Sequence, residues 1–188
     1  MRIISGNFKG KKILQPKDKL TRPLKDLTKE SIFNILKHSK LLNIELESSN
    51  ILDLFSGVGS FGLECLSRGA KNVTFLESYK EVLNILKKNI DNLNQQNQTK
   101  VIEKDIFSEN TLKLISDKFD IIFMDPPYKE KKLSFLLNAI TELKLLNTDG
   151  IIIIHRHKKE EDDLPKAFNL ILEKNYGISK IIFGSILT

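Results

Sequence analysis

Four consecutive residues, Asp125-Pro126-Pro127-Tyr128, combine groups that suit chemistry on an aromatic amine. The exocyclic amine of a nucleobase is a poor nucleophile because its lone pair is delocalised into the ring. A carboxylate and a proline carbonyl can each accept one N–H, which favours a pyramidal nitrogen with an available lone pair. The prolines stiffen the loop, and the Tyr128 ring can stack a base, which is typically worth about 1 to 3 kcal/mol. These properties predict Asp125, Pro126 and Tyr128 as catalytic residues, the alternative being a simple turn after a strand.

A glycine-rich segment supplies a candidate cofactor loop. Gly57, Gly59 and Gly62 follow an apolar run and open an amphipathic one, which is the G-x-G-x-x-G pattern between a strand and a helix. Such loops hold either a dinucleotide or S-adenosylmethionine. Asp53, four residues before the first glycine, would repel a pyrophosphate and would attract a cation. S-adenosylmethionine carries an ammonium and a sulfonium, and we therefore predict it as the cofactor.

Further candidate cofactor residues follow the next two expected strands. Glu77, 20 residues after Gly57, is placed to accept both ribose hydroxyls in either cofactor class. Asp105 and Ile106 are expected to receive the adenine amino group and to pack against its ring, with a helix N-terminal cap as the alternative for Asp105. The predicted cofactor-binding residues are Asp53, Phe55, Gly57, Gly59, Glu77, Asp105 and Ile106.

Short apolar runs alternate with amphipathic stretches from about residue 50, which predicts repeated β-α units and a parallel sheet. Strands are expected over residues 50–54, 72–77, 100–103, 119–124 and 150–155. Helices are expected over residues 59–67 and 79–93, with weaker helical segments over 107–115 and 131–145. Residues 168–174 and 178–186 are too close together for a helical crossover and are expected to form an antiparallel hairpin. The predicted fold is an α/β, doubly wound, Rossmann-like core of seven mostly parallel strands.

The first 42 residues are expected to form a separate extension, with residues 43–188 as the core domain. Residues 2–5 and 12–14 suggest a small hairpin, and residues 24–38 suggest an amphipathic helix. Eleven basic and three acidic residues give residues 1–40 a charge of +8, so the other 148 residues carry −2. A cationic arm on a near-neutral body indicates a nucleic-acid partner, although a solvated lysine-rich surface is the alternative. The candidate RNA-binding residues are Lys9, Lys11, Lys12, Arg22 and Lys25.

The composition excludes several protein classes. With 40% hydrophobic and 29% charged residues, the chain of 188 residues is expected to fold as an ordinary globular protein. No apolar run approaches the roughly 18 residues of a membrane span, and the N-terminus lacks the apolar segment of a secretory signal. A single cysteine, Cys65, excludes an internal disulfide and suggests a buried apolar role, so a cytoplasmic location is expected. His155 and His157 are expected to point to opposite faces of a strand end, and no metal is predicted.

The chain resembles the RsmD family of small-subunit ribosomal RNA guanine-N2 methyltransferases over nearly its whole length. Four segments carry the resemblance: residues 2–13, residues 22–36, residues 53–70 and the tetrapeptide 125–128. The resemblance implies a class I methyltransferase that transfers a methyl group to the N2 amine of the guanine called 966 in 16S rRNA of the small ribosomal subunit. It also shows a departure, since His155 stands where many relatives have an acid. A monomer is expected.

Other functions remain open at this point. A DNA adenine-N6 methyltransferase shares the tetrapeptide but needs a sequence-reading domain, for which 188 residues leave no room. A glutamine methyltransferase would be expected to have Asn in place of Asp125. A NAD-binding oxidoreductase has only the glycine loop in its favour, and a non-catalytic RNA chaperone has no need of Asp53 and Asp125 together.

Overall fold

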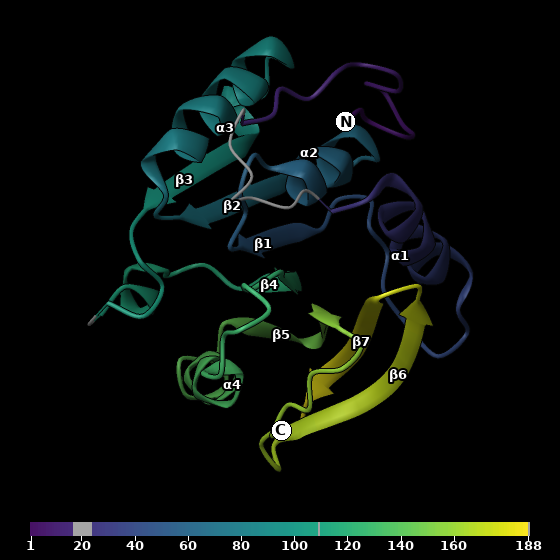
Figure 1. Cartoon of the computed structure of the whole chain (residues 1–188), viewed down its shortest axis with the longest axis vertical. Coiled ribbons are helices and arrows are strands. Elements are labelled where there is room, and N and C mark those ends of the chain that lie inside the picture. The colour runs from purple at the N-terminus through teal and green to yellow at the C-terminus, as the bar shows by residue number, and fades with distance from the viewer. Residues whose placement is uncertain (17–23, 109, 188) are drawn as a thin grey trace.

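A computed structural model, which describes residues 1–16, 24–108 and 110–187, shows one seven-stranded sheet (Figure 1). The strand order is β3-β2-β1-β4-β5-β7-β6. Strands β1 to β5 are parallel, and β7 pairs antiparallel with both β5 and β6. The strands are β1 Asn50–Leu54, β2 Asn72–Glu77, β3 Thr99–Glu103, β4 Phe119–Met124, β5 Leu146–His157, β6 Phe168–Tyr176 and β7 Ser179–Ile186. The predicted α/β fold with a C-terminal antiparallel hairpin is confirmed.

Helices cover both faces of the sheet (Figure 1). They are α1 Asp26–His38, α2 Ser60–Ser67, α3 Lys80–Asn92 and α4 Leu133–Glu142, with 3-10 turns η1 Gln96–Gln98 and η2 Leu112–Leu114. Helices α2 and α3 lie on one face and α4 on the other (Figure 1). The helical segment predicted over residues 107–115 is wrong, because Asn110 adopts a φ of 65° and only the short turn η2 follows it. Within the described residues, no helix is both long and apolar enough to cross a bilayer.

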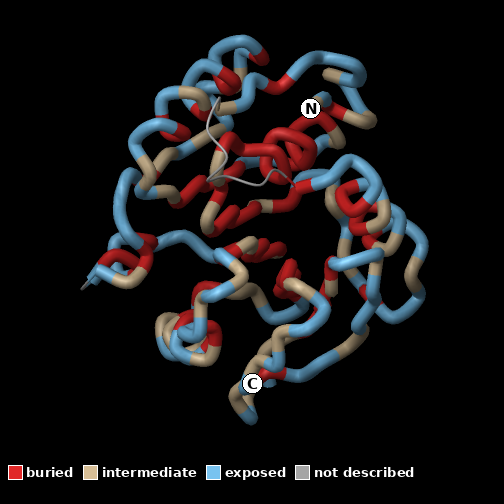
Figure 2. Tube along the Cα trace, viewed as in Figure 1, coloured by how far each residue is buried: buried red, intermediate tan, exposed pale blue. Residues whose placement is uncertain are grey.

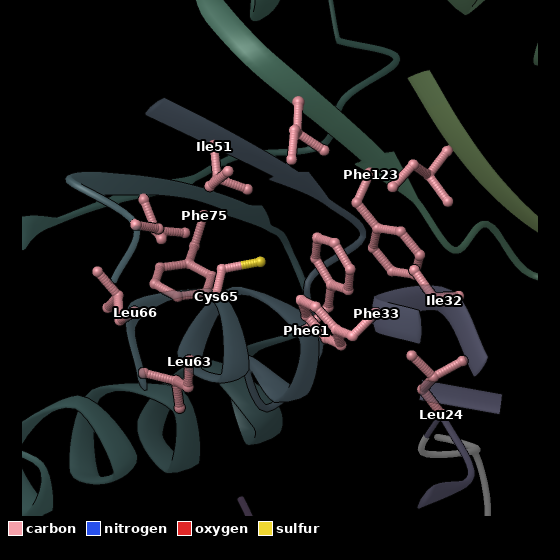
Figure 3. Packing of buried hydrophobic residues seen from close by; sticks show 14 of the residues in the cluster. Leu24, Ile32, Phe33, Ile51, Phe61, Leu63, Cys65, Leu66, Phe75 and Phe123 are labelled. Carbon is pink, nitrogen blue, oxygen red and sulfur yellow. The ribbon is translucent and has the colours of Figure 1, made fainter. Parts of the chain in front are cut away.

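Two hydrophobic clusters sandwich the sheet because alternate strand residues point to opposite faces. In β4, Ile121 and Phe123 pack against the side of α1, α2 and α3, whereas Ile122 and Met124 pack against the side of α4. Buried residues accordingly concentrate in the central strands and in α2, with exposed residues around them (Figure 2). An aromatic stack joins three elements, since the Phe61 ring of α2 lies 4.0 Å from Phe123 and 5.3 Å from Phe33 of α1 (Figure 3).

The N-terminal segment is bound to the core through side chains. The predicted hairpin is reduced to one antiparallel bridge between Arg2 and Lys12, with three neighbouring backbone hydrogen bonds. No longer ladder forms because other backbone N–H groups of the segment donate to Glu64, Ser67 and Asn89 of helices α2 and α3. Residues of this segment and of α1 also belong to the same hydrophobic cluster as the sheet, among them Ile3, Ile13, Leu24, Ile32 and Phe33.

Candidate active site

Three carboxylates gather at one edge of the sheet, where the parallel strands β1, β2 and β4 end. Leu54 of β1 is level with Leu76 of β2 and with Met124 of β4, so Glu77 and Asp125 each come one residue further along. Asp53 lies beside them, one residue before the end of β1. This edge is the place where ligands bind in open α/β sheets.

Asp53 is a buried acid with an incomplete set of partners. Its side chain is 1% exposed, and Oδ2 accepts a hydrogen bond of 3.0 Å from the Gly62 backbone N–H. Within the described residues, Oδ1 has no partner, and neither does the nearby Ser56 Oγ. Burial raises the pKa of Asp53 to about 8, and the charges of Asp125 and Glu77 add to the rise. A buried polar atom without a partner is costly, so this position suits a ligand that brings a positive charge.

The glycines of the loop have different roles. Gly57 has a φ of 53°, and a Cβ there would meet nothing within 4 Å, so the loop is open on that side. At Gly59 and Gly62 the space is filled by the protein itself, because a Cβ would lie 2.5 Å from Leu86 of α3 or 2.4 Å from Phe75 of β2. Ligand approach therefore explains at most the first glycine, and helix packing explains the other two.

Glu77 supports the glycine loop. One carboxylate oxygen accepts the Gly57 N–H at 2.8 Å, and the other accepts the N–H groups of Ser78 and Tyr79 at the same distance. A carboxylate has about four acceptor positions, so three backbone contacts leave one for a hydroxyl group. Ribose binding by Glu77 stays a prediction.

Asp105 and Ile106 have clear structural contacts. Asp105 Oδ1 accepts the Phe107 N–H at 2.9 Å and so closes a turn, not the helix cap considered as an alternative. Ile106 is 4% exposed and belongs to the core on the α4 side. Phe55 adopts a φ of 58°, unusual for a residue with a side chain, and its ring lies 6.0 Å from that of Phe107. Adenine binding by these residues is not tested by the fold.

Together these observations fit the predicted S-adenosylmethionine. The ammonium of the cofactor would meet Asp53 Oδ1 and Ser56 Oγ, two of the buried oxygen atoms that have no partner among the described residues. A pyrophosphate would instead place negative charge beside three carboxylates. The carboxylate and hydroxyl oxygens at this edge of the sheet therefore favour S-adenosylmethionine over a dinucleotide.

The tetrapeptide follows β4 directly and is anchored from several sides. The Asp125 backbone N–H reaches the Leu54 carbonyl of β1 at 3.4 Å, and its side chain is 22% exposed. Pro126 is buried and Pro127 exposed. The half-buried Tyr128 ring lies edge-on to His155 and His157, at centroid distances of 6.2 and 5.2 Å. The expectation that these histidines point to opposite faces is wrong, because residues two apart on a strand share a face.

Two residues at the end of β5 contact the tetrapeptide loop, and the sequence analysis missed both contacts. His155 Nδ1 lies 2.8 Å from Asp125 Oδ1, and its Nε2 lies 2.9 Å from Ser179 Oγ of β7. Arg156 is fully buried and donates to the carbonyls of Pro127 and Glu130 at 3.2 and 2.9 Å. Asp162 neutralises the guanidinium of Arg156 through a bidentate ion pair. Polar residues directly after four buried isoleucines were the signal in the sequence that could have indicated these contacts.

The predicted RNA-binding residues do not lie together. Lys9, Lys11 and Lys12 are exposed on the N-terminal turn, which Ser67 binds at the C-terminal end of α2, away from the glycine loop. Lys25, by contrast, lines a groove of about 430 Å³ between the start of α1 and the β6–β7 turn. Ser179 lines the same groove. Arg22 lies outside the described residues.

Metal binding was not predicted. In the described ranges, no group of three or more His, Cys, Asp or Glu side chains could hold a metal ion. Cys65 is buried, and burial raises the pKa of its thiol well above the usual value.

Comparison with known proteins gives relatives over the whole chain. The family described as conserved hypothetical protein 95 matches residues 1–185. A ribosomal RNA small subunit methyltransferase D from Haemophilus influenzae is 32% identical over 183 residues, which cover 95% of this chain and 90% of that protein. A protein of the same name from Buchnera aphidicola subsp. Acyrthosiphon pisum is 34% identical, over 92% of this chain and 86% of its own length. Among solved structures, a candidate methyltransferase from Escherichia coli has a TM-score of 0.80 at 25% identity, over 99% of this chain and 97% of its own.

Proposed function

The chain belongs to the family described as conserved hypothetical protein 95, and on that premise we propose that it is an S-adenosylmethionine-dependent methyltransferase of ribosomal RNA. Relatives that cover most of the chain are named ribosomal RNA small subunit methyltransferase D, which supports this substrate class. The finer proposal is that the methyl group goes to the exocyclic N2 amine of a guanine, the family's guanine 966, in 16S rRNA of the small subunit.

One observation carries the proposal. A partly exposed carboxylate, with one oxygen that no described residue binds, lies at the same sheet edge as the buried acid that suits a cationic cofactor. Asp125 Oδ1 is bound by His155, whereas no hydrogen bond reaches its Oδ2 from the described part of the chain. Oδ2 is therefore the atom available to accept an N–H from the target amine. Asp125 is close enough to Asp53 that its charge raises the pKa of Asp53.

The residues divide the chemistry between them. When bound, S-adenosylmethionine supplies an electrophilic methyl group on its sulfonium. Asp53 and Ser56 bind the ammonium end of the cofactor. Asp125 Oδ2 and the Pro126 carbonyl each accept one N–H of the target amine, which turns the nitrogen lone pair toward the methyl group. Tyr128 stacks the base and holds its plane.

The groove beside the site supports a long polynucleotide substrate. Ser179 is one of its lining residues, and Ser179 contacts His155, which in turn contacts Asp125. Lys25 also lines the groove and can neutralise a phosphate. Nucleotides next to the target guanine therefore have a place to lie along the same edge of the sheet.

The test is methyl transfer from labelled S-adenosylmethionine to small ribosomal subunits and to naked rRNA, followed by mapping of the modified base. We expect label on the N2 amine of one guanine. Label on an adenine N6 amine would replace the finer proposal, and failure to label any RNA would overturn the function.

Asp125→Ala provides the residue-level prediction. Turnover should fall by at least about 10²- to 10³-fold, because an interaction aimed at the reacting nitrogen is lost. Cofactor affinity, measured by calorimetry, should stay within a few-fold. Asp117→Ala is the control, since Asp117 is an exposed acid whose ion pair is with the exposed Lys100. Near-normal turnover of Asp125→Ala would remove the assignment of this site.

A further inference from the structure

The candidate catalytic carboxylate is the first of three side chains that are joined in a row by hydrogen bonds. They are Asp125 after β4, His155 near the end of β5 and Ser179 at the start of β7. The two contacts, Asp125 Oδ1 to His155 Nδ1 and His155 Nε2 to Ser179 Oγ, measure 2.8 and 2.9 Å. The ring is almost fully buried, with 6% of His155 exposed.

The direction of the first hydrogen bond follows from chemistry. An ionised carboxylate can only accept, so Nδ1 of His155 must carry a proton and donate it to Asp125. In the neutral ring, Nε2 then has a lone pair and accepts the hydroxyl proton of Ser179. In a protonated ring, Nε2 would donate to the same oxygen, and the bond to Asp125 would be unchanged.

The same connectivity in a hydrolase would make the serine a nucleophile, but the exposure of the two ends argues against that role here. Ser179 is 5% exposed, whereas the side chain of Asp125 is 22% exposed. Of the three hydrogen-bonded side chains, the one that a substrate can reach is therefore the carboxylate of Asp125. The histidine and serine lie behind it.

We propose that His155 is the positioning residue for Asp125, and that Ser179 fixes the histidine ring. This inference rests on the proposed function of the same site. By occupying Oδ1, the Nδ1–H group fixes the carboxylate plane and leaves Oδ2 to accept the amine proton. Arg156 completes the arrangement, because it binds the carbonyls of Pro127 and Glu130 further along the loop. Consecutive residues of β5 thus hold the loop at Asp125, Pro127 and Glu130.

Variants of His155 test the role. In His155→Leu the turnover number should fall by about 10- to 100-fold, since small misplacements of reacting groups have effects of this size. The Michaelis constant for RNA and the cofactor affinity should stay within a few-fold. His155→Asn should recover most of the turnover, because an amide N–H can occupy nearly the same place as Nδ1–H and donate to Asp125. Ser179→Ala should lower turnover only a few-fold.

His157→Leu is the matched control, as His157 lies on the same face of β5 and also contacts the Tyr128 ring, without a hydrogen bond to Asp125. Turnover of this control should match the parent. Equal losses in the Leu and Asn variants of His155, in step with their melting temperatures, would overturn the positioning role. So would unchanged turnover in His155→Leu.

The nitrogen-15 NMR spectrum of the histidine rings provides a readout that needs no substrate. The chain has three histidines, and the resonance that disappears in His155→Asn belongs to His155. We expect it to show a protonated Nδ1 that is retained in Ser179→Ala and His157→Leu, and a ring protonated only at Nε2 would overturn the contact itself. If the contact is present but the parent protein methylates no RNA, the proposed function fails and the positioning role fails with it.

Discussion

Glu64 of α2 and Asp53, which binds the backbone of α2, are two buried carboxylates that differ in how many hydrogen-bond donors they meet. Glu64 is fully buried and accepts from the backbone N–H groups of Ile4 and Ser5 and from Arg68 Nε, all at 2.8 or 2.9 Å. It also forms an ion pair of 3.4 Å with the buried Lys29. Asp53, 1% exposed, meets a single donor within the described residues.

The difference separates a structural acid from one prepared for a ligand. Each oxygen of Glu64 is satisfied by groups of the chain, and together these bonds attach the N-terminal segment and α1 to α2. Burial lowers the pKa of Lys29, but the adjacent Glu64 carboxylate opposes that shift. For Asp53 the described part of the protein supplies only the Gly62 N–H to offset the cost of burying a charge, and burial raises the pKa of Asp53 to about 8. Only a cationic ligand would give Asp53 what Glu64 already has.

Glu64→Gln tests the structural role of Glu64 and should give the largest loss in the free energy of unfolding. The substitution keeps the shape but leaves the Lys29 charge uncompensated and turns one acceptor into a donor that faces a backbone N–H. Removing one partner of a buried ion pair costs about 3 to 5 kcal/mol, which urea unfolding would measure. Glu103→Gln is the control, because its salt bridge to Lys87 is half-exposed and worth at most about 1 kcal/mol. Equal losses of unfolding free energy in the two variants would show that the buried network stabilises the fold no more than an exposed salt bridge does.

Asp53→Asn should give the opposite pattern. The free energy of unfolding near pH 7 should change by less than about 1 kcal/mol, since a single hydrogen bond is at stake. The affinity for S-adenosylmethionine should fall by about 10- to 100-fold, because a hydrogen bond to a charged group is worth about 1.5 to 3 kcal/mol. Calorimetry and urea unfolding on the same variant would measure both. A stability loss as large as that of Glu64→Gln would make Asp53 a structural acid instead.

The pH dependence should sharpen the comparison further. With a pKa raised from 3.8 to about 8, Asp53 is protonated in the ligand-free folded protein below pH 8 and ionised in the unfolded chain above about pH 4. Folding stability from this group therefore falls as the pH rises between these values, and levels off above pH 8.

Binding of the cofactor cation requires the ionised form of Asp53. Affinity should therefore rise with pH toward 8, by up to about 10-fold per unit, with close to one proton released on binding near pH 7. Calorimetry in buffers of different ionisation heats would count the proton. Asp53→Asn should lose this release, and a parent protein that releases none would show that Asp53 is ionised before the ligand arrives.

The smallest expected effect concerns the surface of the anchored N-terminal segment. Replacing Lys9, Lys11 and Lys12 with Ala should leave folding intact, as all three are exposed. If they contact the RNA backbone, the slope of binding against salt should decrease by roughly 0.7 to 0.9 per lost phosphate contact. Cofactor binding should not change. The same replacement at Lys113, Lys118 and Lys144, which are also exposed, is the control, and equal slopes in both triple variants would remove the turn from the RNA-binding surface.

Local sequence patterns predicted the strands well and the contacts between them poorly. The bounds of β1, β2 and β4 match the prediction to the residue, because each is a short apolar run with polar or glycine residues beside it. The N-terminal hairpin failed because its N–H groups bond to side chains about 60 residues away, which no local pattern records.

The candidate site shows the same limit. Asp53, Glu77 and Asp125 could be placed at one edge from strand order alone, since parallel strands end on the same side. The contact between Asp125 and His155 spans 30 residues and depends on the register of β4 against β5. An isolated histidine after an apolar strand has many possible partners, so the sequence could not select this one.

The attachment of the N-terminal segment also has a consequence for how the chain folds during synthesis. Ile4, Ser5, Phe8 and Leu14 donate to partners that are 60, 59, 59 and 75 residues later in the sequence. At about 5 to 20 residues per second, these partners are made roughly 3 to 15 seconds after the segment itself. The segment therefore leaves the ribosome without these partners and docks only when helices α2 and α3 have formed. Its apolar residues, Ile3 and Ile13 among them, are exposed to other nascent chains and to chaperones throughout that interval.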